Sequence, residues 1–531
     1  MAEELLILLK GTDCNKGAVA MLKTHLLDYF ECTINSRSDS IAVRHNDNEI
    51  SFSELKQQSQ KVGSLLMEIT GAAVNTPIAV FLPKEINAVI ADIGIMYSSN
   101  PFMNLDVKTP HERIMNIFDL VKPAAVITSR KFSKILSDVD VPVIIIDEID
   151  WNSIIVDEST LLSRRRLLID TDPFCLINTS GSTGTPKGVV LNHRSFFDFM
   201  AVSNDRFDFD GSEVLGSLSP IVFDIFDFEL CMLMCNGSQI VLLDAMLAAF
   251  PARLLEKLVD YRVNFIFWVP SIMVNIANMG LLDKIALPDL RLVWFAGEVF
   301  PTKQFLVWYD KLPDTVFANL YGPIEITLDC TYYVVEERPN ESEPLPIGIP
   351  YHNTDVLLLN DENEKCKIGE EGELCVRGTS LAMGYYNNPE KTAAAFTQNP
   401  LNNSYPEMIY RTGDMAYMRE DGNIMFKGRK DSLIKHMGYR IELGEIEHVI
   451  ENELKLVEYC CAVYQYEKKE IVLYYQNNSE LTEKDFRTAL SKVFPAYMIP
   501  SVYIKMDELP RNTNGKIDRL TLKNKANNPE E

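Results

Sequence analysis

The chain has 531 residues, of which 47% are hydrophobic and 24% are charged, and its formal net charge is −24. An ordinary domain has roughly 100–200 residues, so we expect more than one globular domain. The strong negative charge repels phosphate backbones and anionic lipid, which argues against nucleic acid and membrane as partners.

The N-terminus and the cysteines argue against further classes of protein, namely secreted, membrane-spanning and zinc-binding ones. The chain begins Met1-Ala2-Glu3-Glu4, without the basic region of a signal peptide. No apolar run reaches the about 20 residues that cross a bilayer, so we expect a cytoplasmic protein. The ten cysteines include no Cys-x-x-Cys pair, which disfavours a zinc site and indicates reduced thiols.

Short apolar runs alternate with helical patterns through most of the chain before residue 345. The runs are rich in Val, Ile and Phe and are bounded by polar or turn residues, which is typical of buried strands. Helical stretches such as 53–69 and 251–261 lie between several of them. This alternation predicts α/β sheets covered by helices. The predicted strands are 78–82, 124–128, 143–146, 175–178, 239–243, 264–269 and 292–295.

After residue 345 predicted strands alternate with turns, and Asp421-Gly422 indicates a hairpin. A compact βα pattern follows from residue 440, with an amphipathic segment at 441–453. We therefore place a domain boundary near residue 430, between a large domain of residues 1–430 and a small one of residues 431–531. The strands predicted in this half are 354–359, 372–377, 423–427 and 471–476.

A ten-residue polar loop connects two apolar strands and reads Thr179-Ser180-Gly181-Ser182-Thr183-Gly184-Thr185-Pro186-Lys187-Gly188. Its glycines let backbone N–H groups turn toward an anion, its hydroxyls add donors, and Lys187 adds a positive charge. It is not a Walker loop, because Pro precedes Lys187 and Gly follows it. A flexible linker is the alternative, but the composition favours a phosphate-binding loop.

This loop resembles the phosphate-binding signature of the adenylate-forming superfamily, which includes acyl-CoA synthetases, luciferases and the adenylation domains of nonribosomal peptide synthetases. Further motifs follow in the family's order from about residue 25 to 522. The resemblance implies an α/β fold, with a large N-terminal domain of α/β sheets and a distorted β-barrel, plus a small mobile α+β C-terminal domain. It also implies ATP and Mg²⁺ as cofactors.

The second motif is Asn319-Leu320-Tyr321-Gly322-Pro323-Ile324-Glu325. In relatives the Tyr stacks on adenine, the Asn reads the adenine edge, and the Glu holds Mg²⁺, here together with Thr183. An aromatic face suits a base, and a carboxylate suits a hard cation. Relatives usually have Thr in place of Ile324, so this chain lacks one hydroxyl near the phosphate.

Two motifs lie on either side of the expected domain boundary. Asp414 ends Tyr410-Arg411-Thr412-Gly413-Asp414 and matches the residue that accepts hydrogen bonds from ribose hydroxyls. The resemblance implies that Arg429 contacts ribose or phosphate and that Asp431 is the hinge. Lys435 and Gly438 lie in the segment that reorients for thioester formation.

The last motif, Asn514-Gly515-Lys516, implies the main catalytic residue. In relatives this lysine binds the substrate carboxylate and the α-phosphate, where a positive charge stabilises two anions that must approach each other. Catalysis is thus assigned to Lys516, Thr183 and Glu325. The nucleotide-binding residues implied are Thr179, Ser180, Gly181, Ser182, Thr183, Gly184, Lys187, Gly297, Glu298, Asn319, Leu320, Tyr321, Gly322, Asp414, Arg429 and Lys516.

The substrate is expected to be a small amino acid. Asp224 matches the residue that binds the α-ammonium in amino-acid-activating relatives, although it could instead cap a helix. The implied pocket is bulky and therefore shallow. An inward Asp329 would bind a hydroxyl or an amine, and an outward one would leave Ala or Gly as substrates. The pocket positions are Asp224, Ile225, Phe228, Phe267, Trp294, Ala296, Leu320, Leu328 and Asp329.

The acceptor is expected to be the phosphopantetheine thiol of a separate carrier protein, because no Gly-Gly-x-Ser attachment site follows Lys516. The runs 295–301 and 435–442 are similar to free-standing D-alanine:D-alanyl carrier protein ligases. Arg164-Arg165-Arg166 is a candidate docking patch or a solvated surface. An acyl-CoA synthetase for a non-amino acid is the alternative enzyme, which Asp224 disfavours. A second alternative is a nucleotide-binding scaffold without turnover, and the presence of Lys516 and Glu325 disfavours it.

Overall fold

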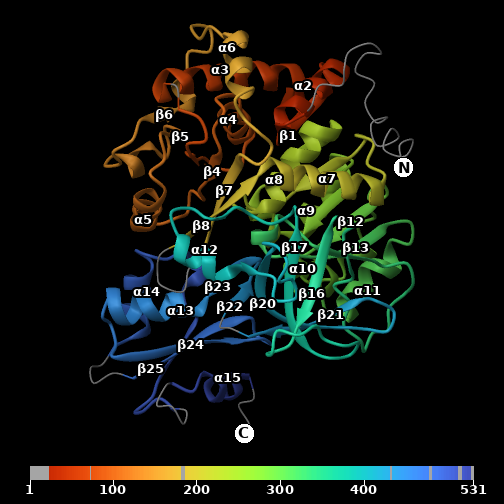
Figure 1. Cartoon of the computed structure of the whole chain (residues 1–531), viewed down its shortest axis with the longest axis vertical. Coiled ribbons are helices and arrows are strands. Elements are labelled where there is room, and N and C mark those ends of the chain that lie inside the picture. Colours follow the sequence, from red (N-terminus) through yellow and green to blue (C-terminus); the bar gives the residue numbers. More distant parts are fainter. Residues whose placement is uncertain are drawn as a thin grey trace.

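The computed structural model describes residues 23–71, 73–180, 186–430, 433–476, 481–511 and 517–527. Two large sheets and a smaller third sheet form the part of the chain before residue 430, and a hairpin and a three-stranded sheet follow. Figure 1 shows the first elements at the top and the C-terminal elements, in blue, at the bottom. The arrangement is the α/β architecture that the sequence predicts.

The first large sheet has nine strands in the order β15-β14-β13-β12-β11-β9-β10-β1-β2. Its centre is parallel, while β2, β14 and β15 run antiparallel to their neighbours. Three of the predicted strands, β10, β11 and β12, lie in it. The bounds are β1 Ile41–His45, β2 Asn48–Ser51, β9 Val214–Ser217, β10 Gln239–Leu242, β11 Phe265–Trp268, β12 Leu292–Phe295, β13 Val316–Tyr321, β14 Thr331–Val334 and β15 Ile349–Pro350.

The second large sheet has seven strands in the order β18-β8-β7-β4-β3-β5-β6. The antiparallel pair β7 and β8 flanks the phosphate-loop motif, with Thr179 opposite Lys187. Sequence reasoning missed β4, although it predicted β5 and β6, which are equally short. The bounds are β3 Ile78–Phe81, β4 Phe102–Asn104, β5 Val126–Thr128, β6 Val143–Ile145, β7 Pro173–Thr179, β8 Lys187–Asn192 and β18 Gly384–Tyr385.

Helices cover both large sheets. The pair α3 and α4 packs closely because each has a glycine at the contact: a Cβ on Gly63 would lie 2.7 Å from the Tyr97 Cβ, and one on Gly94 would lie 2.6 Å from the Val62 Cβ. The bounds are α2 Leu26–Arg37, α3 Phe52–Thr70, α4 Ile86–Tyr97, α5 His111–Val121, α6 Glu158–Arg165, α7 His193–Phe207, α8 Asp224–Cys231, α9 Pro251–Asp260, α10 Pro270–Asn278, α11 Thr302–Lys311 and α12 Pro389–Ala395.

The third sheet has five antiparallel strands, in the order β16-β17-β20-β19 with β21 paired to β20. The predicted turn at Asp421-Gly422 connects β20 to β21. The paired strands carry Asp414 and Arg429 opposite each other. The bounds are β16 Thr354–Leu359, β17 Gly372–Gly378, β19 Phe396–Gln398, β20 Met408–Met418 and β21 Ile424–Arg429.

The C-terminal elements begin with a hairpin. The helix predicted at 441–453 starts two residues later, at Leu443, because Ile441 and Glu442 pair with β22 in this hairpin. The expected boundary and the hinge Asp431 stay predictions, since residues 431 and 432 lie outside the described part. The bounds are β22 Leu433–His436, β23 Tyr439–Glu442, α13 Leu443–His448, β24 Tyr459–Gln465, β25 Glu470–Gln476, α14 Glu483–Leu490, β26 Val502–Lys505 and α15 Arg519–Asn527.

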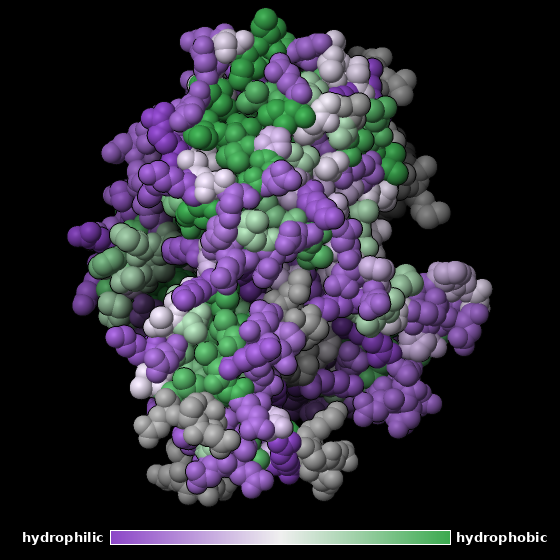
Figure 2. All heavy atoms as spheres, turned by 90° about the vertical axis from the view of Figure 1, so that its left-hand side faces the viewer, coloured by the Kyte–Doolittle hydropathy of each residue, from purple (hydrophilic) through white to green (hydrophobic). Residues whose placement is uncertain are grey.

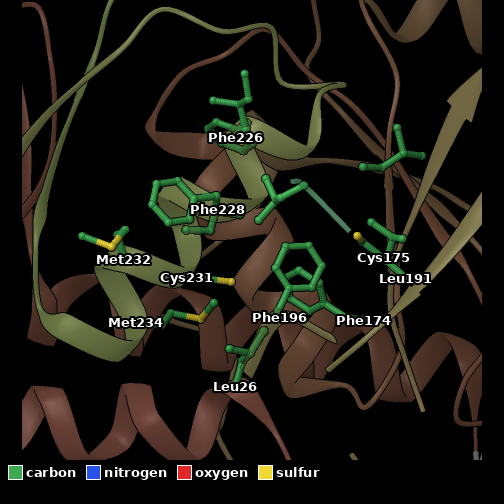
Figure 3. Close-up of a cluster of buried hydrophobic side chains, with 14 of the residues drawn as sticks. Leu26, Phe174, Cys175, Leu191, Phe196, Phe226, Phe228, Cys231, Met232 and Met234 are labelled. Atoms are coloured by element: carbon green, nitrogen blue, oxygen red, sulfur yellow. The ribbon is translucent and has the colours of Figure 1, made fainter. Parts of the chain in front are cut away.

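The main core lies beneath α8, the helix that starts with Asp224. Figure 3 shows Phe226 and Phe228 of α8 lying over Cys175 of β7 and Phe196 of α7, with Leu26 of α2 below them. These side chains are almost fully buried. Such close packing fixes the position of α8 and therefore of the carboxyl group at its first residue.

The surface is mixed in character. Figure 2 shows hydrophilic side chains over most of the face at the left of Figure 1, with an apolar area toward the top. Among the helices that the structure describes, none has the length and apolar character to span a bilayer. Cys175, Cys231 and Cys330 are buried free thiols.

Candidate active site

A cavity of about 180 Å³ lies where β7, α8 and the β13–β14 connection meet the β22–β23 hairpin. Its lining joins the predicted phosphate loop, substrate pocket, ribose motif and thioester segment, which are far apart in the sequence. The predicted residues that line it are Thr179, Ser180, Asp224, Ile225, Phe267, Ala296, Gly297, Gly322, Leu328, Asp329, Asp414, Arg429, Lys435 and Gly438.

The other predicted residues fall into two groups. The first group is described by the structure but does not line the cavity: Lys187, Phe228, Trp294, Glu298, Asn319, Leu320, Tyr321 and Glu325. Those that lie outside the described residues are Gly181, Ser182, Thr183, Gly184, Asp431 and Lys516. The described neighbours of Lys516, Arg511 and Ile517, pair with each other, and Ile517 packs on the core beside α15.

The ribose motif forms a tight network around Asp414. The Tyr321 hydroxyl donates to Asp414 Oδ2 over 2.5 Å, and Arg429 Nη1 donates to Asp414 Oδ1 over 2.5 Å. Burial and the neighbouring Asp414 raise the pKa of Tyr321 well above its usual range, so this phenol stays a donor. Asn319, expected at the adenine edge, donates through Nδ2 to the Pro346 carbonyl oxygen over 2.7 Å.

Glu325 is fully buried and both of its carboxylate oxygens are bonded. The Tyr385 hydroxyl donates to Oε1 over 2.8 Å, and Arg440 Nη1 donates to Oε2 over 2.5 Å. Burial alone would raise the pKa of Glu325, but the Arg440 charge and these hydrogen bonds lower it. The carboxylate is therefore ionised and already pairs with a cation, the Arg440 guanidinium.

This chemistry fits one protein ligand of Mg²⁺, which takes one or two carboxylates and completes its shell with phosphate oxygens and water. No group of three or more His, Cys, Asp or Glu side chains in the described part could hold a metal by itself. The expected partner of Glu325, Thr183, lies outside the described residues.

The β22–β23 hairpin reaches across to the phosphate end of the cavity. Ser180 Oγ donates to the Arg440 carbonyl oxygen over 2.8 Å and accepts from the Glu442 amide over 3.0 Å. Lys187 Nζ lies 2.6 Å from Glu442 Oε1. The segment predicted to reorient for thioester formation therefore faces the cavity in this arrangement.

Glu298 ties the turn of the hairpin to the large domain. Its Oε1 accepts from the Gly438 amide over 2.8 Å, and its Oε2 accepts from the Ser271 amide over 2.9 Å. Gly438 has φ +82°, and a Cβ there would lie 3.0 Å from Val269 Cγ1. The turn thus needs glycine both for its backbone angle and for its close approach.

Two carboxyl groups face the substrate end of the cavity. Burial raises the pKa of Asp224 to about 6, against the opposing effects of the Ile225 amide and the Lys435 charge. Burial, and then Asp224, raise the pKa of Asp329 well above its usual range. Because the helix cap is Phe223 and Asp224 is the first helical residue, the capping alternative does not explain Asp224.

The backbone around Asp329 has the strain of a constrained turn. Thr327 and Leu328 have φ of 55° and 65°, in the left-handed region that disfavours such residues. A Cβ on Gly322 would lie 2.2 Å from the Leu328 carbonyl oxygen, so glycine alone lets the two segments touch. This close contact directs Asp329 into the cavity.

Aromatic side chains close the pocket behind these carboxyls. Phe228 stacks on Trp294 with ring centroids 5.2 Å apart, and Phe267 meets Trp294 edge to face at 5.4 Å. Phe228, Trp294 and Leu320 are buried and stand behind the lining. Bulky side chains thus occupy these positions, and the shallow pocket expected from them stays a prediction.

Two of the three arginines at 164–166 make internal contacts. Arg164 Nη1 donates to the Gly71 carbonyl oxygen over 2.7 Å, and Arg165 Nε lies 3.1 Å from Asp28 Oδ1. These bonds hold α6 against the N-terminal helices. The run is therefore no free docking patch.

Residues 30–386 match the sequence model of a family described as AMP-binding enzyme. The chain belongs to this family. Bacitracin synthase 1 of Bacillus licheniformis is 31% identical over 504 residues, which cover 94% of this chain and 9% of that protein. Tyrocidine synthase 1 of Brevibacillus parabrevis is 29% identical over 500 residues, which cover 93% of this chain and 44% of that protein. The chain thus spans less than half the length of these relatives.

A third relative has a similar length: Zwittermicin A synthase ZmaJ of Bacillus cereus is 28% identical, over 94% of this chain and 95% of that protein. Two solved structures share the fold. The Vibrio cholerae adenylation domain AlmE, in complex with glycyl-adenosine-5'-phosphate, has a TM-score of 0.82 at 18% identity and covers 96% of this chain and 99% of its own. Holo-PA1221, which contains adenylation and PCP domains, has a TM-score of 0.79 at 20% identity over 94% and 84%.

Membership of the AMP-binding enzyme family agrees with the adenylate-forming superfamily that the motifs predict. The narrower similarity to D-alanine:D-alanyl carrier protein ligases stays a prediction. The run 435–442 contains Arg440 and Glu442, but the sequence predicted no role for them, although their opposite charges were a signal. It missed Tyr385, for which no local signal existed.

Proposed function

We propose that this chain activates a small amino acid with ATP, releases pyrophosphate, and passes the aminoacyl group to the phosphopantetheine thiol of a separate carrier protein. The observation that carries this proposal is the pair of carboxyl groups, Asp224 and Asp329, that face one cavity beside the ribose motif. A buried carboxylate needs a cationic partner, and the α-ammonium of an amino acid supplies one.

In the first half-reaction, a substrate carboxylate oxygen attacks the α-phosphorus of ATP, and the bond to pyrophosphate breaks. Asp224 orients the amino acid through its ammonium group, and Asp414 orients the ribose. Lys516 is proposed to neutralise the approaching anions. Bound Mg²⁺ would neutralise phosphate charge, with Glu325 and Thr183 as the residues that would hold it.

In the second half-reaction, the thiol sulfur attacks the acyl carbon, AMP leaves with the bonding electron pair, and the thiol proton passes to solvent. The arrangement in which β22–β23 faces the cavity supports this step. Gly438 lines the cavity through its closely packed turn, and Lys435 lies near Asp414 and Asp329.

The carrier is supported by the relatives: PA1221 contains adenylation and PCP domains, and NpsA-ThdA is an adenylation-PCP fusion.

The test is to incubate the chain with ATP, Mg²⁺ and a mixture of amino acids, and then with either a phosphopantetheinylated carrier protein or coenzyme A. We expect mass spectrometry to detect an aminoacyl thioester on the carrier. Thioester formed on coenzyme A with a fatty or aryl acid, and none with an amino acid, would instead support the acyl-CoA synthetase alternative.

A further inference from the structure

Strand β23 carries two opposite charges into the phosphate end of the cavity. Arg440 and Glu442 are two residues apart, so their side chains leave the same face of the strand. Arg440 Nη1 lies 2.5 Å from Glu325 Oε2, and Glu442 Oε1 lies 2.6 Å from Lys187 Nζ. A cation from the C-terminal part thus sits on the expected metal ligand, and an anion sits on the lysine of the phosphate loop.

We propose that Arg440 and Glu442 are positioning residues that stand in for the metal ion and the phosphate after pyrophosphate has left. This inference rests on the proposed function, in which pyrophosphate leaves the same site. The strand would then hold the thiol-transfer arrangement only when Glu325 and Lys187 have lost their substrate-derived partners. The departure of pyrophosphate itself would select the second arrangement.

The geometry makes the two occupants mutually exclusive. Both oxygens of Glu325 are engaged, one by the Tyr385 hydroxyl and one by Arg440. The side chain of Glu325 is fully buried and that of Lys187 is 13% exposed, so water cannot replace a lost partner well. Each group therefore needs one opposite charge, and the strand and magnesium pyrophosphate compete to provide it.

The remaining contacts of the hairpin involve no phosphate-binding charge. Gly438 donates its amide hydrogen to Glu298, and Arg113 Nη1 lies 2.7 Å from Glu445 Oε1. These contacts stabilise the same arrangement without depending on pyrophosphate. Glu445 therefore provides a matched control, because its replacement removes the Arg113 contact and weakens the arrangement but leaves the competition intact.

Amide hydrogen exchange on the full-length chain tests the proposal without an activity assay. The Gly438 and Glu442 amides donate across to the large domain, so their exchange reports whether this arrangement forms. We expect magnesium pyrophosphate, added without amino acid, to speed exchange in 433–442 by about tenfold, a typical coupling between two binding events.

Variants separate charge competition from simple packing. Glu442→Gln should show faster exchange without ligand and a clearly smaller response to magnesium pyrophosphate, because only the Arg440 pair still competes, whereas Arg440→Lys, which keeps the charge, should retain the response. Glu445→Gln should exchange faster and still respond fully. The proposal is overturned if pyrophosphate leaves the wild-type exchange unchanged, or if Glu442→Gln responds as the wild type does.

Failure of the proposed function gives a different result. In that case amino acids would support no aminoacyl thioester in the separate assay, whatever the exchange at 433–442. Loss of the exchange response with normal thioester formation would reject only the roles of Arg440 and Glu442.

Discussion

At the scale of single residues, we propose that substrate choice depends on Asp224. Its carboxyl group begins α8 above a packed core and faces the cavity. Because burial raises its pKa to about 6, the ionised form is costly unless a cation binds. The sequence pointed to Asp224 through the resemblance to amino-acid-activating relatives, since the run Phe223–Phe228 also contains Asp227.

Replacement of Asp224 by Ala should remove the partner of the substrate ammonium. A buried ion pair that loses one member costs roughly 3 kcal/mol, so kcat/KM for amino-acid-dependent pyrophosphate exchange should fall about 100-fold or more. Binding of ATP, measured by equilibrium titration, should change little, since Asp224 lies apart from the Asp414 network. An unchanged kcat/KM would show that another group binds the ammonium.

Asp329 should set the preference for the side chain. Its carboxyl group lines the cavity, so a substrate hydroxyl or amine can meet it. An unpaired buried polar group costs about 1–3 kcal/mol. We expect the wild type to favour serine or 2,3-diaminopropionate over alanine by about tenfold, and Asp329→Ala to lose that preference in pyrophosphate exchange. Preference of the wild type for alanine or glycine would contradict this role.

At the scale of elements, fewer than half of the described strands were predicted, and these are mostly short Val-, Ile- and Phe-rich runs, which have few alternatives in a buried sheet. The hairpin strand at Ile441 and Glu442 could not, since its residues also fit a helical pattern and pair with β22 only in the tertiary fold. The contact between Arg440 and Glu325 could not be predicted for the same reason. They join segments 115 positions apart, and local motifs carry no such information.

Two buried histidines at the starts of α2 and α7 should make the fold sensitive to acid. The rings of His25 and His193 lie 3.9 Å apart, and burial lowers the pKa of His193 to about 3 and that of His25 well below its usual range. Both stay neutral when folded but take up a proton below about pH 6.5 when unfolded. The burial of each histidine therefore lowers the free energy of unfolding as the pH falls below about 6.5.

The expected loss is about 2 kcal/mol per histidine between pH 6.5 and pH 5. Urea unfolding of the wild type and of His193→Phe at pH 7.5 and pH 5 measures it as a difference between the two proteins. The variant should lose less stability on acidification. His352, which is exposed, provides the control His352→Gln, and equal pH dependence in all three proteins would contradict the account.

At the scale of the whole molecule, several basic side chains lie close together at the candidate site of an otherwise acidic chain. Lys187, Arg429, Lys435 and Arg440 surround the phosphate and ribose end despite the net charge of −24. The same region joins the large sheets to the C-terminal hairpin, and Figure 1 shows β22 and β23 beside β20 there. An anionic nucleotide can thus bind within an overall repulsive field.

Lys516 should act only in the first half-reaction, after the C-terminal part has changed its position. Lys516→Ala should lower the rate of adenylate formation by about 100-fold or more, because a preorganised charge at the transition state is lost. Transfer from separately supplied aminoacyl-adenylate to the thiol should continue. Rapid-quench measurement of each half-reaction checks this, and equal loss in both halves would contradict the separation of roles.

The most direct test of amino-acid activation is ATP–pyrophosphate exchange across a panel of amino acids of both chiralities, with acetate, fatty acids and aryl acids as comparisons. The account predicts Mg²⁺-dependent exchange with a small amino acid and far less with the corresponding acid that lacks the amine. Exchange with fatty or aryl acids alone would contradict it.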